Sequence, residues 1–379
     1  MFQYLSFRAA MAIITALLIA IVFGRKIIDR LARLQIGEEI RNLGLEGQMQ
    51  KKGTPTMGGI IILLAIVVPM LLFCDLTNIY IQLMLVSTIW LGAIGGADDY
   101  IKVFRHNKEG LKGRFKIVGQ VGLGVIVGTT MWLNADIVVR DGASLPTELR
   151  GEVVEQNYFA PEQGKVAETV VTEGVKTTQT TIPFIKDNEF DYKWLAGGNE
   201  TLGWLVYVLV AIFVITAVSN GANLTDGLDG LSSSVTVPVM VFFTAASIAA
   251  GRFDLAILPA TLVGGLIAYL FYNWYPAKVF MGDTGSLFLG GAVVGLAFAL
   301  NMPLVLLFVG LIYIIETMSD ILQVGYFKLT HGKRLFKMSP IHHHFEMCGW
   351  KEVKIVLVFS AVSAVMCVIA WFGIAQRAW

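Results

Sequence analysis

Ten runs of predominantly apolar residues limit the folds that this chain can adopt. A helix needs about 20 apolar residues to cross the hydrocarbon core of a bilayer. Hydrophobic residues make up 55% of the 379 residues and charged residues 15%, whereas a soluble domain carries about 25% charged residues. We therefore predict an all-α polytopic integral membrane protein. Its ten expected spans lie near 6–24, 57–74, 79–97, 117–134, 201–218, 232–250, 255–273, 286–301, 303–327 and 355–374.

Charge and cysteine content exclude several other classes of protein. The net charge is +1, so no excess of basic residues points to a nucleic-acid partner. The three cysteines are odd in number and far apart, which favours neither a disulfide framework nor a Cys-based metal site. The first apolar run lacks an A-x-A cleavage pattern, and we interpret it as a retained span rather than a signal peptide.

The basic residues lie almost entirely on one side of the predicted spans. Of the 29 Lys and Arg residues, 20 fall in five alternate loops, and only Arg8, Arg252 and Arg377 fall in the short segments of the other side. Because cytoplasmic loops carry the excess of Lys and Arg, this asymmetry predicts that the five loops are cytoplasmic and that both termini are extracytoplasmic. The five loops are 25–56, 98–116, 219–231, 274–285 and 328–354.

Residues 135–200 form the one long segment on the opposite side. The segment is acidic, with 12 Asp and Glu against 6 Lys and Arg. Stretches rich in Val and Thr within it favour β-strands. It is either a small β-rich insertion or a loop without regular structure, and it holds no motif with evident chemistry. We treat 1–379 as a single transmembrane domain that contains this extracytoplasmic insertion.

Polar motifs gather in the five cytoplasmic loops, so they are expected to converge on one site. The carboxylates are Asp98 and Asp99 in "DDYIKV", Asp226 and Asp229 in "NLTDGLDG", and Asp283 in "FMGDTGS". Asp283 suits a helix N-cap, and a lone aspartate in a Gly-rich turn suits an Asx turn. Clustered oxygen ligands instead favour a hard cation such as Mg²⁺, which takes one or two carboxylates together with substrate phosphates.

Three consecutive histidines, His342 to His344, lie in the last of these loops. Their spacing does not match a helical zinc site, so zinc is the weaker interpretation. Imidazoles beside Lys and Arg suit phosphate or uracil recognition better. Acidic residues, lysines and Gly-rich turns at a membrane surface indicate phosphoryl chemistry at the lipid interface. No Walker motif is present, which argues against ATP hydrolysis.

Five motifs together resemble the phospho-N-acetylmuramoyl-pentapeptide transferase family, within the polyprenyl-phosphate N-acetylhexosamine-1-phosphate transferase superfamily. They are "KKGTPTMGG", "DDYIKV", "GANLTDGLDGL", "YPAKVFMGDTGSL" and "PIHHHFE". The resemblance covers the chain outside about 135–200. It implies ten spans in the bacterial cytoplasmic membrane, Mg²⁺ and a homodimer. It also implies transfer of phospho-MurNAc-pentapeptide from UDP-MurNAc-pentapeptide to undecaprenyl phosphate, which gives lipid I and UMP.

The resemblance also implies roles for individual residues. Asp98, Asp99 and Asp283 match catalytic aspartates, with Asp283 and Asp99 as metal ligands. The remaining matches imply contacts with the substrates. Those substrate-binding residues are Lys52, Lys116, Asn223, Asp226, Asp229, His342 and His343.

Two other functions fit parts of the pattern. The same chemistry on UDP-GlcNAc is possible for the superfamily, although the triple histidine argues against it. An ion-coupled transporter would need charges near the middle of its spans. Glu316 and Asp320 are the best such residues, and they either pack as polar residues or line a catalytic site.

Overall fold

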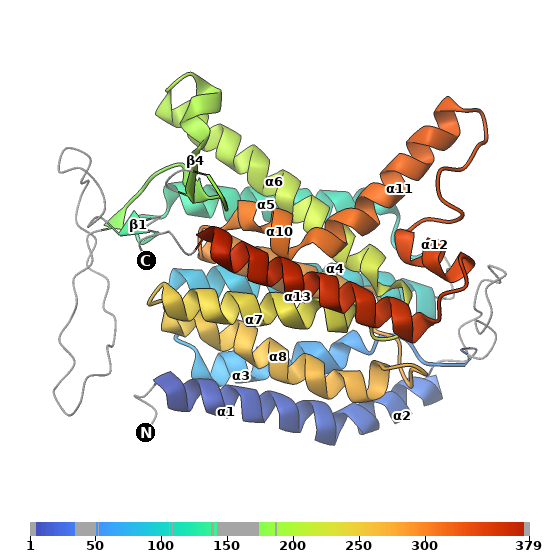
Figure 1. Cartoon of the computed structure of the whole chain (residues 1–379). Coiled ribbons are helices and arrows are strands. Elements are labelled where there is room, and N and C mark those ends of the chain that lie inside the picture. Colours follow the sequence, from blue (N-terminus) through green and yellow to red (C-terminus); the bar gives the residue numbers. More distant parts are fainter. Residues whose placement is uncertain are drawn as a thin grey trace.

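Helices make up most of the structure, a computed structural model of the chain (Figure 1). It describes residues 5–34, 51, 53–105, 107, 109–137, 140–141, 174–185 and 188–374. The long helices are α1 (Leu5–Leu18), α2 (Gly24–Leu34), α3 (Gly59–Phe73), α4 (Ile79–Phe104), α5 (Gly113–Leu133), α6 (Glu200–Leu224), α7 (Leu231–Ala249), α8 (Phe253–Asn273), α9 (Gly282–Ala299), α11 (Leu311–Leu329) and α13 (Glu352–Ile374). The shorter helical segments are η1 (Ile19–Phe23), η6 (Tyr192–Ala196), η7 (Thr225–Gly227), η8 (Pro303–Val305), α10 (Leu306–Val309) and α12 (Ile341–Met347).

The described helices agree with the predicted membrane class and refine the spans. Within the described residues, eight helices are long and apolar enough to cross a membrane, and a bent pair brings the number to nine if it counts as one span. The run predicted at 57–74 forms α3, which has only 15 residues. The run predicted at 303–327 is not one straight helix, because its two halves meet at an angle of 81° before Leu311. Predicted loops also proved shorter: α4 continues past Asp98 and Asp99 to Phe104.

Helix α9 is the centre of the bundle, since every residue from Thr284 to Ala299 is buried. Glycines on α9 let its neighbours approach closely. A Cβ atom placed on Gly291 would lie 2.4 Å from the carbonyl oxygen of Ser87 on α4. One on Gly290 would lie 2.8 Å from the Cα atom of Ser219 on α6. Small residues at such crossings are how membrane helices gain close van der Waals packing.

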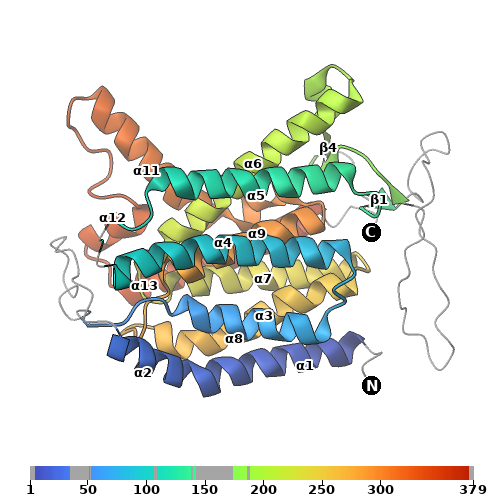
Figure 2. The same cartoon turned by 180° about the vertical axis from the view of Figure 1, so that it is seen from behind.

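Helices α6 and α11 diverge from the rest of the bundle, as both views show (Figures 1 and 2). Helix α11 leaves toward the end of the bundle that carries α12, and α6 begins at the opposite end, near β4 (Figure 1). The divergence of α11 follows from the 81° bend between α10 and α11. Several large apolar side chains on α11 are exposed, among them Ile321 and Leu322, as expected for a surface that faces lipid.

The predicted insertion contains two short antiparallel strand pairs. Strand β1 (Arg140–Asp141) pairs with β2 (Gly174–Val175), and β3 (Gln179–Thr181) pairs with β4 (Glu189–Asp191). The second pair is anchored to the bundle, because Thr181 N–H donates to the carbonyl of Asn301. The buried Tyr192 ring packs edge-on against Tyr207 of α6, with 5.5 Å between ring centroids. This part of 135–200 is therefore part of the core and not a detached loop.

We expect residues 142–173, which lie outside the described residues, to be dispensable for folding. Their two ends are already side by side, since Asp141 pairs with Gly174 in the β1–β2 ladder. An Asn-Gly turn that joins Asp141 to Gly174 would close the hairpin. Because the entropy cost of closing a loop changes only slowly with its length, shortening this loop should alter stability little. A variant in which an Asn-Gly turn replaces residues 142–173 should remain monodisperse in detergent, and its Tm should equal that of the unmutated protein. By contrast, Tyr192→Ala should lower Tm clearly, because truncating a buried aromatic residue costs about 3–5 kcal/mol.

Candidate active site

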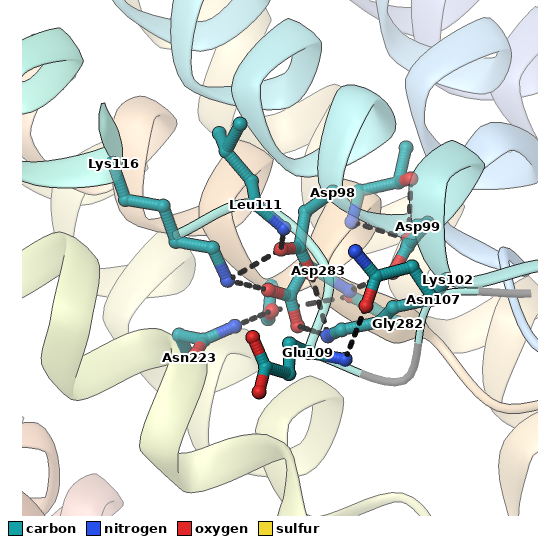
Figure 3. A network of polar contacts seen from close by, with 12 residues as sticks. Asp98, Asp99, Lys102, Asn107, Glu109, Leu111, Lys116, Asn223, Gly282 and Asp283 are labelled. Atoms are coloured by element: carbon teal, nitrogen blue, oxygen red, sulfur yellow. Dashed lines mark hydrogen bonds and ion pairs between the residues drawn. The ribbon is translucent and has the colours of Figure 1, made fainter. Parts of the chain in front are cut away.

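Asp98 lies in the last turns of α4, where a loop and two lysines enclose it (Figure 3). Its side chain is fully buried. Lys102, one turn further along α4, places Nζ 2.5 Å from Asp98 Oδ2. Lys116 Nζ is 3.0 Å from Asp98 Oδ1, and the backbone N–H of Leu111 donates to the same oxygen at 2.7 Å. Two ammonium groups therefore balance a carboxylate that would otherwise be costly at a helix end inside a bilayer.

Both lysines also reach Asp283, in the first turn of α9. Lys116 Nζ is 2.5 Å from Asp283 Oδ2, and Lys102 Nζ is 3.5 Å from Asp283 Oδ1. The Asp283 side chain is 16% exposed, so it is open to solvent whereas Asp98 is not. Lys116 thus bridges the two carboxylates, as Figure 3 shows.

Asp99 has a different environment from its neighbour. Its Oδ2 accepts hydrogen bonds from the backbone N–H and the hydroxyl of Thr284, at 2.8 and 2.6 Å. Its Oδ1 accepts the backbone N–H of Asp283 at 3.1 Å. An anionic group beside unpaired N–H groups stabilises a helix N-terminus. Asp99 therefore fixes the start of α9 and, with it, the position of Asp283.

Glycines permit the close contact between α4, α3 and the start of α9. A Cβ atom on Gly95 would lie 2.0 Å from the carbonyl oxygen of Asp283, and one on Gly59 would lie 2.1 Å from the nitrogen of Gly285. The residues before α3 also pair with those before α9, because Phe280 N–H donates to the carbonyl of Pro55. The sequence motifs at 51–59 and 278–286 are therefore in contact, as their shared loop side predicted.

Asn223 and Asp226 approach the cluster from the end of α6. Asn223 Nδ2 donates to Ser286 Oγ on α9 at 2.9 Å, and Figure 3 places Asn223 beside Asp283. Asp226 accepts a hydrogen bond from the backbone N–H of Gly282. Both residues thus lie next to the segment that carries Asp283, together with the predicted aspartates.

The three aspartates of this cluster offer a geometry that fits a metal ion. One carboxylate oxygen from each of Asp98, Asp99 and Asp283 lies within 4.8 Å of the others. Oxygen ligands of this kind suit Mg²⁺. Asp283 is the best placed of the three to share a cation with a substrate, since it is the most exposed.

Asp229 lies apart from the aspartate cluster, in a network of its own. Lys51 Nζ contacts Asp229 Oδ1 at 2.7 Å and Glu352 Oε1 at 2.6 Å. Asp229 Oδ2 accepts the backbone N–H of Ala277 at 2.9 Å. Burial alone would lower the pKa of Lys51, but the two carboxylates outweigh it, so the pKa is raised. In this structure Asp229 ties three loops together, and Lys52 lies outside the described residues.

The three histidines have three different surroundings. His342 is buried, and its Nδ1 lies 3.0 Å from Glu316 Oε2. His343 is partly exposed and pairs through Nδ1 with Glu346 at 2.6 Å. His344 accepts the backbone N–H of Lys337 through Nδ1 at 3.1 Å. His343 and His344 are both partly buried. His344 Nε2 lies 3.7 Å from Cys348 Sγ, whereas His343 Nε2 makes no hydrogen bond among the described residues.

Sequence reasoning missed several residues of the site. Lys102 was detectable, because it follows Asp98 by four residues and such pairs share a helix face. Thr284 and Ser286 carried no signal of their own. For Glu316 the sequence left open whether it packs as a polar residue or lines the site, and its contact with His342 joins residues that are 26 positions apart. Lys51, which was not among the predicted site residues, forms ion pairs with Asp229 and Glu352.

Two family descriptions match parts of this chain. The family model described as glycosyl transferase family 4 matches residues 165–301. The signature described as phospho-N-acetylmuramoyl-pentapeptide-transferase signature 1 matches residues 51–63.

Relatives named phospho-N-acetylmuramoyl-pentapeptide-transferase resemble nearly the whole chain. The Parabacteroides distasonis protein is 48% identical over 373 residues, covering 92% of this chain and 86% of the relative. The Flavobacterium psychrophilum protein is 45% identical over 394 residues, covering 97% and 93%. The Porphyromonas gingivalis protein is 47% identical, covering 92% and 86%. Each of these relatives thus matches more than nine tenths of the chain.

Proposed function

The chain belongs to the phospho-N-acetylmuramoyl-pentapeptide-transferase family, and we propose that its aspartate–lysine cluster carries out the phosphoryl transfer of that family. The enzyme transfers phospho-MurNAc-pentapeptide from UDP-MurNAc-pentapeptide to a membrane lipid, giving lipid I and UMP. The acceptor that we propose is undecaprenyl phosphate. The observation that carries the assignment is the meeting of Asp98, Asp99 and Asp283 within 4.8 Å at one end of an apolar bundle.

The products define the bond that must break. A lipid phosphate oxygen attacks the β-phosphorus of the donor, the bond from that phosphorus to the bridging oxygen breaks, and UMP leaves. Negative charge on both substrates opposes their approach. Lys102 and Lys116 offer two positive charges there, and they are partly exposed. We assign them to the phosphates of the two substrates, where a lysine ammonium acts as a point charge.

Asp98 is the proposed general base for the lipid phosphate. Asp98 contacts both lysines, as Asp283 does, so a phosphate held by those lysines comes close to it. An acceptor phosphate that carries a proton is the weaker nucleophile, and a carboxylate within hydrogen-bond reach removes that proton. Asp99 serves as the positioning partner, through its hydrogen bonds to Asp283 and Thr284.

Mg²⁺ is the proposed cofactor. Asp283 would hold it, with Asp99 as the second ligand expected from the family resemblance, and Asp98 completes the group of carboxylates that fits a cation. When bound, such an ion neutralises charge that develops on the transferring phosphate. Asp283 supplies the partly exposed oxygen needed for a ligand shell that is shared with substrate.

The donor is proposed to lie between the end of α6 and the triple-histidine segment. Asn223 and Asp226 flank Asp283, and the His343 side chain is partly exposed. Asp229, Lys52 and His342 remain assigned to the donor site by the family resemblance. Both Asp229 and His342 are buried, so they would support the residues that contact the donor and would not contact it at the protein surface.

Sidedness follows from the charge asymmetry of the loops. We propose that the site faces the cytoplasm and that the chain crosses the bacterial inner membrane ten times, with both termini outside. The start of α1 and the end of α13 lie at the end of the bundle that carries the β-strands, opposite α12 (Figure 1). That arrangement supports the proposal, as does the shared location of the lysine-rich loops. A homodimer is the assembly expected from the family.

The function is tested by UMP release from the purified protein in the presence of undecaprenyl phosphate and Mg²⁺. UDP-MurNAc-pentapeptide should give lipid I and a stoichiometric amount of UMP, whereas UDP-GlcNAc should give neither. Turnover with UDP-GlcNAc instead would assign the protein to the related GlcNAc-1-phosphate transferases. Absence of UMP with both donors, from monodisperse protein, would overturn the proposed function.

A further inference from the structure

Glu316 is a carboxylate buried in α11 that the proposed mechanism does not use. Its side chain is 0% exposed and lies on a helix that otherwise carries many apolar side chains. A buried carboxylate is costly unless it is paired and hydrogen-bonded. Glu316 is not one of the three clustered aspartates, so the metal site does not explain why a carboxylate is buried at this position.

The partner of Glu316 is His342, the first histidine of the triple motif. Glu316 Oε2 and His342 Nδ1 are 3.0 Å apart, and both side chains are buried. As a carboxylate, Glu316 can only accept, so the contact places the imidazole proton on Nδ1 and fixes the tautomer and plane of the ring. His342 Nε2 has no hydrogen-bond partner among the described residues.

The far side of the His342 ring faces the loop that carries Asp226. A Cβ atom on Gly227 would lie 2.2 Å from His342 Nε2. The φ angle of Gly227 is not positive, so the position is restricted by this contact and not by its own backbone. The next residue toward α6 is Asp226, which accepts the N–H of Gly282 beside Asp283. The ring is therefore a spacer between α11 and the loop at 225–230.

Two further polar residues on the same face of α11 hold the segment that precedes the histidines. Asp320 Oδ1 accepts the hydroxyl of Ser339 at 2.7 Å. Gln323 Oε1 accepts the backbone N–H groups of Leu335 and Phe336, at 3.0 and 2.9 Å. Residues at i, i+4 and i+7 share one side of a helix. Glu316, Asp320 and Gln323 thus form a polar seam that fastens the triple-histidine segment to α11.

We propose that Glu316 is a positioning residue for the donor nucleotide: it holds His342 against Gly227 and so keeps Asp226 and His343 in place. The inference rests on the proposed function, because it assigns the 225–230 loop and His343 to the donor. The acceptor side of the site, with Asp98 and Lys102, has no contact with the seam among the described residues. Loss of the Glu316 contact should therefore affect donor binding selectively.

The test is steady-state kinetics of UMP release with each substrate varied in turn. Glu316→Ala should raise KM for UDP-MurNAc-pentapeptide about tenfold, as expected when one partner of a buried charged hydrogen bond is removed. KM for undecaprenyl phosphate should change less than about twofold. Glu316→Gln should restore donor KM to within about threefold of the unmutated value, because its Oε1 still accepts from Nδ1–H.

A control and a double variant separate positioning from a general loss of structure. Thr317→Val, on the next residue, removes a hydroxyl whose one hydrogen bond among the described residues is to the carbonyl of Tyr313 within α11. It should leave both KM values unchanged. Glu316→Ala combined with His342→Ala should be no worse than the more impaired single variant, because the two residues act as one unit. Equal increases in both KM values, unchanged donor KM, or fully additive effects would each overturn the proposal.

Gly227 provides a second test that does not depend on how Glu316→Ala folds. Gly227→Ala should raise donor KM in the unmutated background, whereas Gly227→Ala in the His342→Ala background should show no additional increase. An equal penalty in both backgrounds would contradict the spacer role of His342. If the unmutated protein itself releases no UMP, the proposed function fails first, so the two failures are distinguishable.

Discussion

Asp283→Asn should abolish turnover while leaving the fold intact. The side chain keeps its size, and its 16% exposure means that little packing is lost. Asparagine cannot supply an anionic ligand, and it also weakens the ion pairs with Lys116 and Lys102. A bound metal contributes several kcal/mol of transition-state stabilisation, so kcat should fall roughly a thousandfold or more.

The measurement is UMP release over a range of Mg²⁺ concentrations, with Tm recorded in parallel. Asp254→Asn is the matched control: it makes the same substitution at the first turn of α8, where Asp254 Oδ2 accepts from Asn78. That variant should retain full activity. Near-normal turnover of Asp283→Asn at the Mg²⁺ concentration that supports the unmutated enzyme would contradict the assignment of Asp283 as a metal ligand.

Asp98→Asn and Asp99→Asn should fail in different ways, because the two carboxylates have different partners. Asp98 contacts two lysines. If it deprotonates the lipid phosphate, it is needed only while that phosphate carries a proton, and the second pKa of a phosphate monoester is roughly 6. The sign is therefore fixed: activity of Asp98→Asn relative to the unmutated enzyme should rise as pH increases through that value.

Asp99→Asn should instead lose stability and show no such recovery. Its carboxylate accepts from Asp283 N–H on one oxygen and from Thr284 on the other. An amide keeps only one of these acceptors, and an unsatisfied buried group costs about 1–3 kcal/mol. Tm should therefore drop, and extra Mg²⁺ should restore only part of the activity.

A pH–rate profile, a Mg²⁺ titration and a melting curve for each variant distinguish the roles. Two results together would show that Asp98 acts as a nucleophile and not as a general base. The first is an Asp98→Asn protein that is inactive at every pH, and the second is a ³²P-labelled enzyme trapped from the unmutated protein in the absence of lipid. Asparagine is not a competent nucleophile, so a covalent route would not recover with pH.

Much of the fold could be predicted because bilayer physics leaves a strong pattern in the sequence. The apolar runs gave the helices, and α3, at 15 residues, is the one that a length criterion alone would miss. The bend before Leu311 was not predictable. Gly310 lies at that point and ends α10, but a single glycine in a continuous apolar run is also tolerated inside a helix. The glycine marks where the chain can turn, whereas the 81° angle between α10 and α11 has no signal in the local sequence.

The composition of the site was predictable, but the partners of its residues were not. The positions of Asp98, Asp99 and Asp283 followed from motifs that lie on one side of the membrane. The division of labour between Asp98 and Asp99 did not, because it depends on which oxygen meets a lysine and which meets the start of α9. Asp229 and Asp226 are three residues apart and look equivalent in sequence, yet the former pairs with Lys51.

The glycine contacts around Asp283 bear on how the reaction barrier is lowered. Its backbone carbonyl meets α4 at Gly95, and the following turn meets α3 at Gly59, with no room for a methyl group at either point. Water would have to reorient as charge moves between the acceptor and the leaving UMP. The backbone that carries the Asp283 carboxylate is held on two sides and has little freedom to shift. Catalysis gains from polar groups that need no reorganisation during the reaction. The rigid centre of the bundle therefore holds polar groups in the orientation that the transition state needs before the reaction begins.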